Sequence, residues 1–168
     1  MEREDRAPTD TRAMLSKLGD TMKQSYIEEN ARERKRMRSL VESLSDEQLL
    51  IPLEDEWTIA VALAHLAFWD QRSLFLIRKW KESGIIEQSP IDIEVINDAL
   101  LSIWLLLPPR KAANLAMSCA ELIDRELEET PIDIIEKIET VEGKSRVYRA
   151  IHRKMHLDRI EEVINKKA

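Results

Sequence analysis

The chain has 168 residues, and its 32 acidic and 26 basic side chains give a formal net charge of −6. This negative charge repels nucleic acid and anionic membrane surfaces, so neither is an expected partner. Cys119 is the single cysteine, which excludes an intramolecular disulfide and a cysteine-rich metal site and suits a reducing compartment. The N-terminal stretch MEREDRAPTD has no apolar segment, and no apolar run approaches the ~20 residues of a membrane span, so we expect a cytoplasmic protein.

The composition predicts one all-α domain. A chain of this length forms a single hydrophobic core without the help of disulfides. Three glycines and six prolines leave little material for hairpins, whereas the many Ala, Leu, Glu, Lys and Arg residues favour helices. Residues 1–8 are charged and patternless and predict a disordered N-terminal tail, so the domain covers residues 9–168.

Apolar residues at helical spacing predict four long helices. The expected spans are 9–43, 58–83, 91–129 with a break at Pro108-Pro109, and 144–165. Thr58 is the expected N-cap of the second helix, and Gly84 is expected to end it. A short amphipathic turn is expected at residues 132–138. Four such helices describe a four-helix bundle, which builds metal and ligand sites from side chains on facing helices.

The connection between the first two helices has two signals. Ser45-Asp-Glu-Gln48 has the form of a capping box, and Pro52 followed by the acidic residues 54–56 predicts a loop.

In the first helix, residues 32–38 are rich in Arg and Lys, but glutamates lie on the same turns. This stretch is either an ordinary solvated face or an anion-binding one.

Three histidines form the candidate site. Residues 59–69 are apolar except for His65, so this stretch predicts a buried helix with one imidazole inside the protein. The other two, His152 and His156, are four residues apart in the last helix and therefore lie on one side of it, bordering the core. Three neutral imidazoles can hold Zn²⁺ or Ni²⁺ and leave a coordination position for water. The alternatives are a hydrogen-bonded core histidine and a pair on a solvated face.

The neighbours of these histidines supply no general base through a known motif, because Arg153 stands where a zinc protease has glutamate. Asp70 either orients a ligand or is a surface charge. Tyr148 and Arg149, one turn before His152, are candidate substrate contacts. Four aromatic residues either line a substrate pocket or belong to the plain core; they are Trp57, Phe68, Trp69 and Trp104.

These motifs carry a family resemblance. Glu56-Trp57-Thr58, Ala64-His65-Leu66 and Trp69, followed by the stretch from Arg149 to Ile160, resemble the DinB/YfiT-like family of four-helix bundles over nearly the whole chain. Asn97-Asp98-Ala99-Leu100 with Pro108-Pro109 is similar to one group of that family. The resemblance implies an up-down bundle with a zinc or nickel ion held by three histidines, which match His65, His152 and His156.

The same resemblance implies two classes of reaction. Family members include metal-dependent hydrolases, and S-transferases or isomerases that use low-molecular-weight thiols such as bacillithiol or mycothiol. The first hypothesis is therefore an enzyme in which a metal-bound water or thiol attacks a small-molecule substrate. The alternative is a non-catalytic small-molecule binding or protective protein that uses the same cavity.

A homodimer is also expected. The third helix carries apolar side chains on more than one face, and this excess apolar surface needs a partner. The residues concerned are Leu101, Trp104, Leu105 and Leu106.

Overall fold

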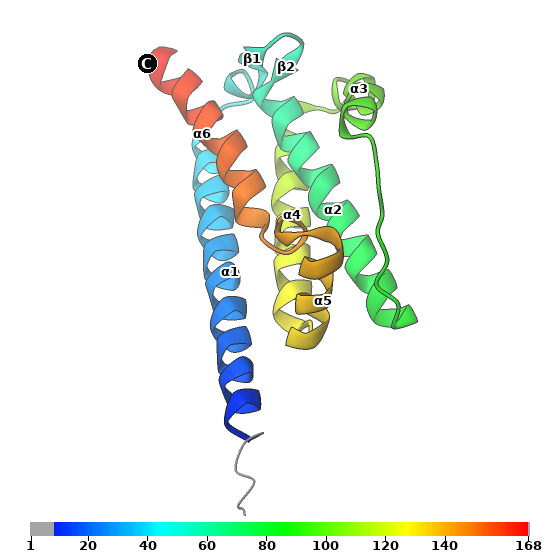
Figure 1. The fold of residues 1–168 in the computed structure, drawn as a ribbon. Coiled ribbons are helices and arrows are strands. Elements are labelled where there is room, and N and C mark those ends of the chain that lie inside the picture. The colour runs from blue at the N-terminus through cyan, green and yellow to red at the C-terminus, as the bar shows by residue number, and fades with distance from the viewer. Residues whose placement is uncertain (1–8, 168) are drawn as a thin grey trace, which may run out of the picture.

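Four long helices pack side by side in the computed structural model, which describes residues 9–167 (Figure 1). They are α1 (Thr9–Ser43), α2 (Ile59–Ser83), α4 (Pro109–Glu129) and α6 (Arg149–Lys167). The predicted all-α fold and four-helix bundle are confirmed. The predicted tail at residues 1–8 lies outside the described residues. Among those that are described, no helix combines the length and the apolar character needed to cross a bilayer.

The chain directions in the bundle are up, down, down and up, because α1 and α6 run one way and α2 and α4 the other (Figure 1). The helices α2 and α4 are therefore parallel, although they are consecutive bundle helices along the chain. Residues 84–108 return the chain along the length of the bundle and contain α3 (Ile93–Trp104). The third predicted helix is thus two separate helices, and α3 lies beside α2, near the end where α2 begins (Figure 1).

Three predictions about the shorter elements need correction. Residues 52–58 form a small antiparallel hairpin, β1 (Pro52–Glu54) with β2 (Trp57–Thr58), where a loop was predicted. Two residues turn the chain at its tip, and one of them, Asp55, has a φ of 42°. The amphipathic turn after α4 is a full helix, α5 (Ile132–Glu142). The last bundle helix begins at Arg149, five residues later than predicted, because a 3₁₀ turn, η2 (Lys144–Arg146), precedes it.

The predicted helix signals around α2 are confirmed. The Thr58 hydroxyl accepts a hydrogen bond from the Val61 amide, and Gly84 ends α2 with a φ of 70°, a left-handed conformation that glycine adopts without strain. The capping box also forms, since the backbone amide of Ser45 donates to the Gln48 side chain and the Gln48 amide to the Ser45 hydroxyl. It precedes a single 3₁₀ turn, η1 (Gln48–Leu50).

The core consists of two apolar clusters, one toward each end of the bundle. The cluster near the hairpin contains the first half of α2, from Ile59 to Ala67. The other contains Leu74, Ile77 and Trp80 from the second half of α2. The stretch of α2 between them carries the buried Asp70, and the positions beside it on the other three bundle helices carry further charged side chains. The three predicted histidines lie next to this charged layer.

Candidate metal centre

The bundle brings the three predicted histidines together. His65 comes from the middle of α2, and His152 and His156 come from successive turns of α6. One ring nitrogen of each lies within 4.8 Å of the others. The Nε2 atoms of His65 and His152 are 2.9 Å apart. Two imidazole nitrogens bound to one tetrahedral Zn²⁺ lie about 3.3 Å apart, so the three ring nitrogens are near the spacing that one ion requires.

Burial keeps the three imidazoles neutral. His65 is 4 % exposed, and burial together with the neighbouring His156 lowers its pKa to about 3. Burial and the nearby Arg159 lower the pKa of His156 to about 4. Burial and the Arg149 guanidinium hold the pKa of His152 well below its usual range. A neutral imidazole is the form that binds a metal ion, so protonation does not compete with metal binding at ordinary pH.

Two ring nitrogens of the cluster are buried without a hydrogen-bond partner. They are Nδ1 of His65 and Nε2 of His156. Buried polar groups are nearly always paired, so an unpaired nitrogen inside a protein needs a reason. A metal ion beside Nε2 of His156 would explain the unpaired nitrogen, because the ion would bind the lone pair that no donor in the described structure reaches. The donor set therefore fits a three-histidine divalent metal site.

Aromatic rings enclose the cluster on the side of the hairpin and α3. Trp57 stacks on His156 with an interplanar angle of 7° and a centroid distance of 6.4 Å. Trp104 and Trp69 meet His65 edge to face at 5.5 and 6.1 Å. Of the four predicted pocket residues, these three tryptophans lie against the histidines, whereas Phe68 packs on Trp69 and Trp104. The Trp69 indole also donates to Asn97 of α3.

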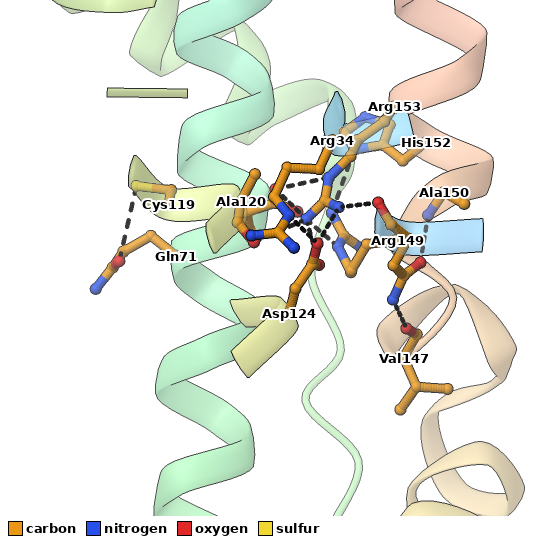
Figure 2. Close-up of polar contacts among 12 residues, drawn as sticks. Arg34, Gln71, Cys119, Ala120, Asp124, Val147, Arg149, Ala150, His152 and Arg153 are labelled. Atoms are coloured by element: carbon orange, nitrogen blue, oxygen red, sulfur yellow. Dashed lines mark hydrogen bonds and ion pairs between the residues drawn. The ribbon is translucent and has the colours of Figure 1, made fainter. Parts of the chain in front are cut away.

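A layer of buried ion pairs lies directly beside the histidines and joins all four bundle helices; we call Arg34, Asp70, Asp124, Arg149 and Arg153 the polar layer. Its centre is Arg153, which has no exposed surface. The Arg153 guanidinium donates to both carboxylate oxygens of Asp124 at 2.8 and 2.9 Å (Figure 2), and to Asp70 at 3.0 Å. Arg34 of α1 pairs with Asp124 at 3.0 Å. Paired charges of this kind tolerate burial.

The structure decides between the two readings of Asp70. Its side chain is 1 % exposed, so the surface-charge reading is wrong. The carboxylate accepts hydrogen bonds from Arg149 at 2.7 Å and from Arg153. Arg149 in turn places its Nη2 atom 3.3 Å from Nδ1 of His152. Asp70 therefore orients Arg149 rather than a histidine.

The two candidate substrate contacts lie in different surroundings. Arg149 is 4 % exposed, and its donors are directed at Asp70, the Ser145 carbonyl and His152. The Tyr148 ring lies 6.5 Å from Tyr26, against the apolar cluster at the other end of the bundle. The structure thus brings Arg149, but not Tyr148, to the histidines.

Sequence reasoning missed two features of this site. The first is Arg153, whose position between two inward histidines of the same helix was the available signal of a buried ion pair. The second is Arg159, three residues after His156, whose charge acts on that histidine. Its position on the same helix, one turn further on, was the available signal.

Comparison with known proteins gives one match. The family model of the DinB superfamily matches residues 29–141. No curated protein and no solved structure matches the chain. The matched segment covers two thirds of the chain and includes His65, and the fold and the three-histidine cluster agree with the resemblance seen in the sequence. The chain belongs to the DinB superfamily.

Proposed function

We propose that this protein is a metal-dependent enzyme in which His65, His152 and His156 hold one divalent ion, Zn²⁺ or Ni²⁺. The observation that carries the proposal is the meeting of three ring nitrogens within 4.8 Å, in a group that contains no carboxylate or thiolate. Three imidazoles suit both metals, and three protein ligands with one open position are typical of catalytic rather than structural sites.

When bound, such an ion lowers the pKa of a water or a thiol and so creates a nucleophile at neutral pH. The reaction is then a hydrolysis or an S-transfer on a small molecule, with a low-molecular-weight thiol as the candidate second substrate. The chain's own residues supply the surroundings. Trp57, Trp69 and Trp104 shield the histidines from solvent, which strengthens electrostatic interactions at the site. Burial keeps the imidazoles neutral and able to bind.

A second candidate function is non-catalytic binding of a small molecule in the same place. The enclosure of the histidines by aromatic rings favours it, since such walls suit an apolar ligand. The group of possible ligands also contains no carboxylate that could act as a general base. Turnover of model esters, amides or thiol acceptors separates the two functions, because a binding protein gives saturable binding without product.

We further propose a cytoplasmic homodimer. The free, buried thiol of Cys119 supports a reducing compartment. The dimer is supported by the outer face of α3 and the turn after it, where Ile103, Leu105 and Leu106 are 54, 47 and 83 % exposed. Trp104 does not belong to this face because it is buried against the histidines.

Metal content tests the proposed site. Protein purified without an affinity tag or added metal should contain about one zinc or nickel ion per chain. The variants His65→Ala, His152→Ala and His156→Ala should each lose it, because ligands of one ion fail together. Each variant should stay folded, since the bundle buries its apolar clusters without the ion. Protein that takes up no metal, or a histidine variant that keeps all of it, would contradict the site as assigned.

A further inference from the structure

Arg159 lies at the edge of the histidine cluster, on the turn of α6 that follows His156. Its side chain is 41 % exposed, and its Nη1 atom pairs with Glu54 of β1 at 2.6 Å. This is the ion pair by which the hairpin contacts α6. Arg159 also donates a long hydrogen bond of 3.5 Å from Nη2 to the Leu53 carbonyl. The guanidinium is thus held by one exposed carboxylate and reaches solvent.

Two independent observations place this ion pair beside the cluster. Trp57, in the other strand of the same hairpin, stacks on the His156 ring. Arg159 follows His156 by three residues in α6, so the two side chains lie on the same face of the helix, one turn apart. The hairpin therefore brings an indole and an ion pair to the same imidazole, and a ligand in contact with His156 lies within reach of Arg159.

The partners of Arg159 set it apart from the other arginines near the site. Arg153 is fully buried between two carboxylates, and Arg149 is buried against Asp70. Neither can turn toward a ligand without leaving a buried carboxylate unpaired. Arg36, one helix away, is held by three carboxylates. An exposed single ion pair such as Arg159–Glu54 contributes little to stability, so a ligand carboxylate can replace Glu54 at small cost.

The proposed metal ion would bind the reacting group of the substrate, so a carboxylate at the other end of the ligand needs a different cation. Another guanidinium in the described structure, that of Arg72, lies over Trp69 and is held by the Ser89 carbonyl and hydroxyl. The cluster is made of three neutral imidazoles, and the rings around it are indoles and Phe68. A carboxylate taken from water into such a place needs a paired, hydrogen-bonded cation. A guanidinium offers a planar fork of donors that matches a carboxylate, which makes arginine specific as well as attractive.

We propose that Arg159 is a specificity-determining residue that binds a carboxylate of the substrate, with Glu54 holding its place in the free protein. This inference rests on the proposed function, since it assigns the substrate class of that same site. The substrate is then a small molecule with an apolar body, a carboxylate at one end and the reacting group at the other. The aromatic rings contact the apolar body, and Arg159 selects molecules that carry the carboxylate.

A matched pair of ligands tests this inference by tryptophan fluorescence. 3-Phenylpropionate and 3-phenyl-1-propanol share an apolar body and differ in the carboxylate. Zinc-supplemented and chelator-treated protein are titrated with each. The wild type should bind the carboxylate about tenfold more tightly than the alcohol. In chelator-treated Arg159→Gln this preference should vanish, while the affinity for the alcohol stays within about twofold.

Two further variants separate recognition from general charge effects. Glu54→Gln should bind 3-phenylpropionate severalfold more tightly, because the competing carboxylate is gone. Lys154→Gln removes an exposed cation from the same helix, one that pairs with Asp158, and should keep the full preference. Equal affinities for acid and alcohol in the wild type, or an unchanged preference in Arg159→Gln, would overturn the role of Arg159. Protein that discriminates through Arg159 yet takes up no metal would instead overturn the metal-dependent function and leave this role standing.

Discussion

The Nη2 atom of Arg149 lies 3.3 Å from Nδ1 of His152. A guanidinium only donates hydrogen bonds, so Nδ1 accepts and the ring proton of neutral His152 sits on Nε2. From there it is directed at Nε2 of His65, 2.9 Å away. A metal ion bound through Nε2 of His152 requires the opposite tautomer, with the proton on Nδ1. Arg149, held by Asp70, therefore favours the metal-free form of this histidine.

Replacing Arg149 by glutamine should raise the affinity for zinc by about tenfold. The amide oxygen of glutamine can accept a hydrogen bond from Nδ1–H of His152, which the guanidinium cannot do. Competition with a chromophoric chelator measures the change. Arg149→Met, which removes the donor and offers no acceptor, is the matched comparison and should give a smaller gain. Zinc affinity that falls in a folded Arg149→Gln protein would show that Arg149 supports the site instead.

Arg153 should be the most sensitive position for stability in α6. Arg153→Ala leaves the buried carboxylates of Asp70 and Asp124 without their shared partner, which we expect to cost about 3–5 kcal/mol of unfolding free energy. Lys154→Ala, one residue away, breaks an exposed pair with Asp158 and should cost less than about 1 kcal/mol. Urea unfolding of the two variants measures both values. Similar losses in the two would mean that the polar layer does not stabilise the bundle.

The pH dependence of stability should follow the histidines. The pKa of His156 is lowered to about 4 in the folded protein, so between the ordinary value near 6.5 and about 4 the unfolded chain binds the proton and the folded chain does not. The contribution of His156 to the free energy of unfolding is therefore complete above about pH 6.5, and it is lost as the pH falls through this window. Metal-free protein should therefore become less stable from about pH 7 to pH 4.5.

The control for this titration is His156→Leu, since depressed carboxylates such as Glu142 also weaken the folded state in acid. Only the difference between the two proteins reports the histidine. The variant should show a shallower loss of unfolding free energy with falling pH, measured by urea titration in the presence of a chelator. Parallel curves for the two proteins would mean that His156 is protonated as easily in the folded state as in the unfolded one.

The sequence predicts the bundle and the histidine cluster because both depend on local patterns. Residues 59–69 are apolar around one imidazole, and only a buried helix accommodates that pattern. The spacing of His152 and His156 places both on one side of α6. The caps of α2 are equally local, since Thr58 and Gly84 each act on backbone groups within one turn.

The features that the sequence did not predict depend on contacts distant along the chain. Arg153 reaches Asp70, which is 83 residues away, and charged residues are assigned to solvent unless a partner is known. The direction of α4 depends on how residues 84–108 cross the bundle, which periodicity does not encode. The hairpin at residues 52–58 is held by only two short strands, too short for an alternating pattern to show.

The outer face of α3 should form the homodimer interface. If Ile103 and Leu106 lie in a homodimer interface, a charge at either position becomes buried without a partner on association. Ile103→Glu and Leu106→Glu should therefore turn a dimer into a monomer, as measured by light scattering at micromolar concentration. Each variant should keep its metal and its helical content, because neither side chain packs in the core.

Ile151 of α6 provides a matched control, because its exposed fraction of 55 % is close to the 54 % of Ile103. Ile151→Glu adds the same charge to another exposed apolar position and should leave the dimer intact. Dissociation by Ile151→Glu but not by the α3 variants would move the interface to α6. A wild-type protein that is monomeric at these concentrations would remove the dimer from the proposal without touching the metal site, because all three histidines come from one chain.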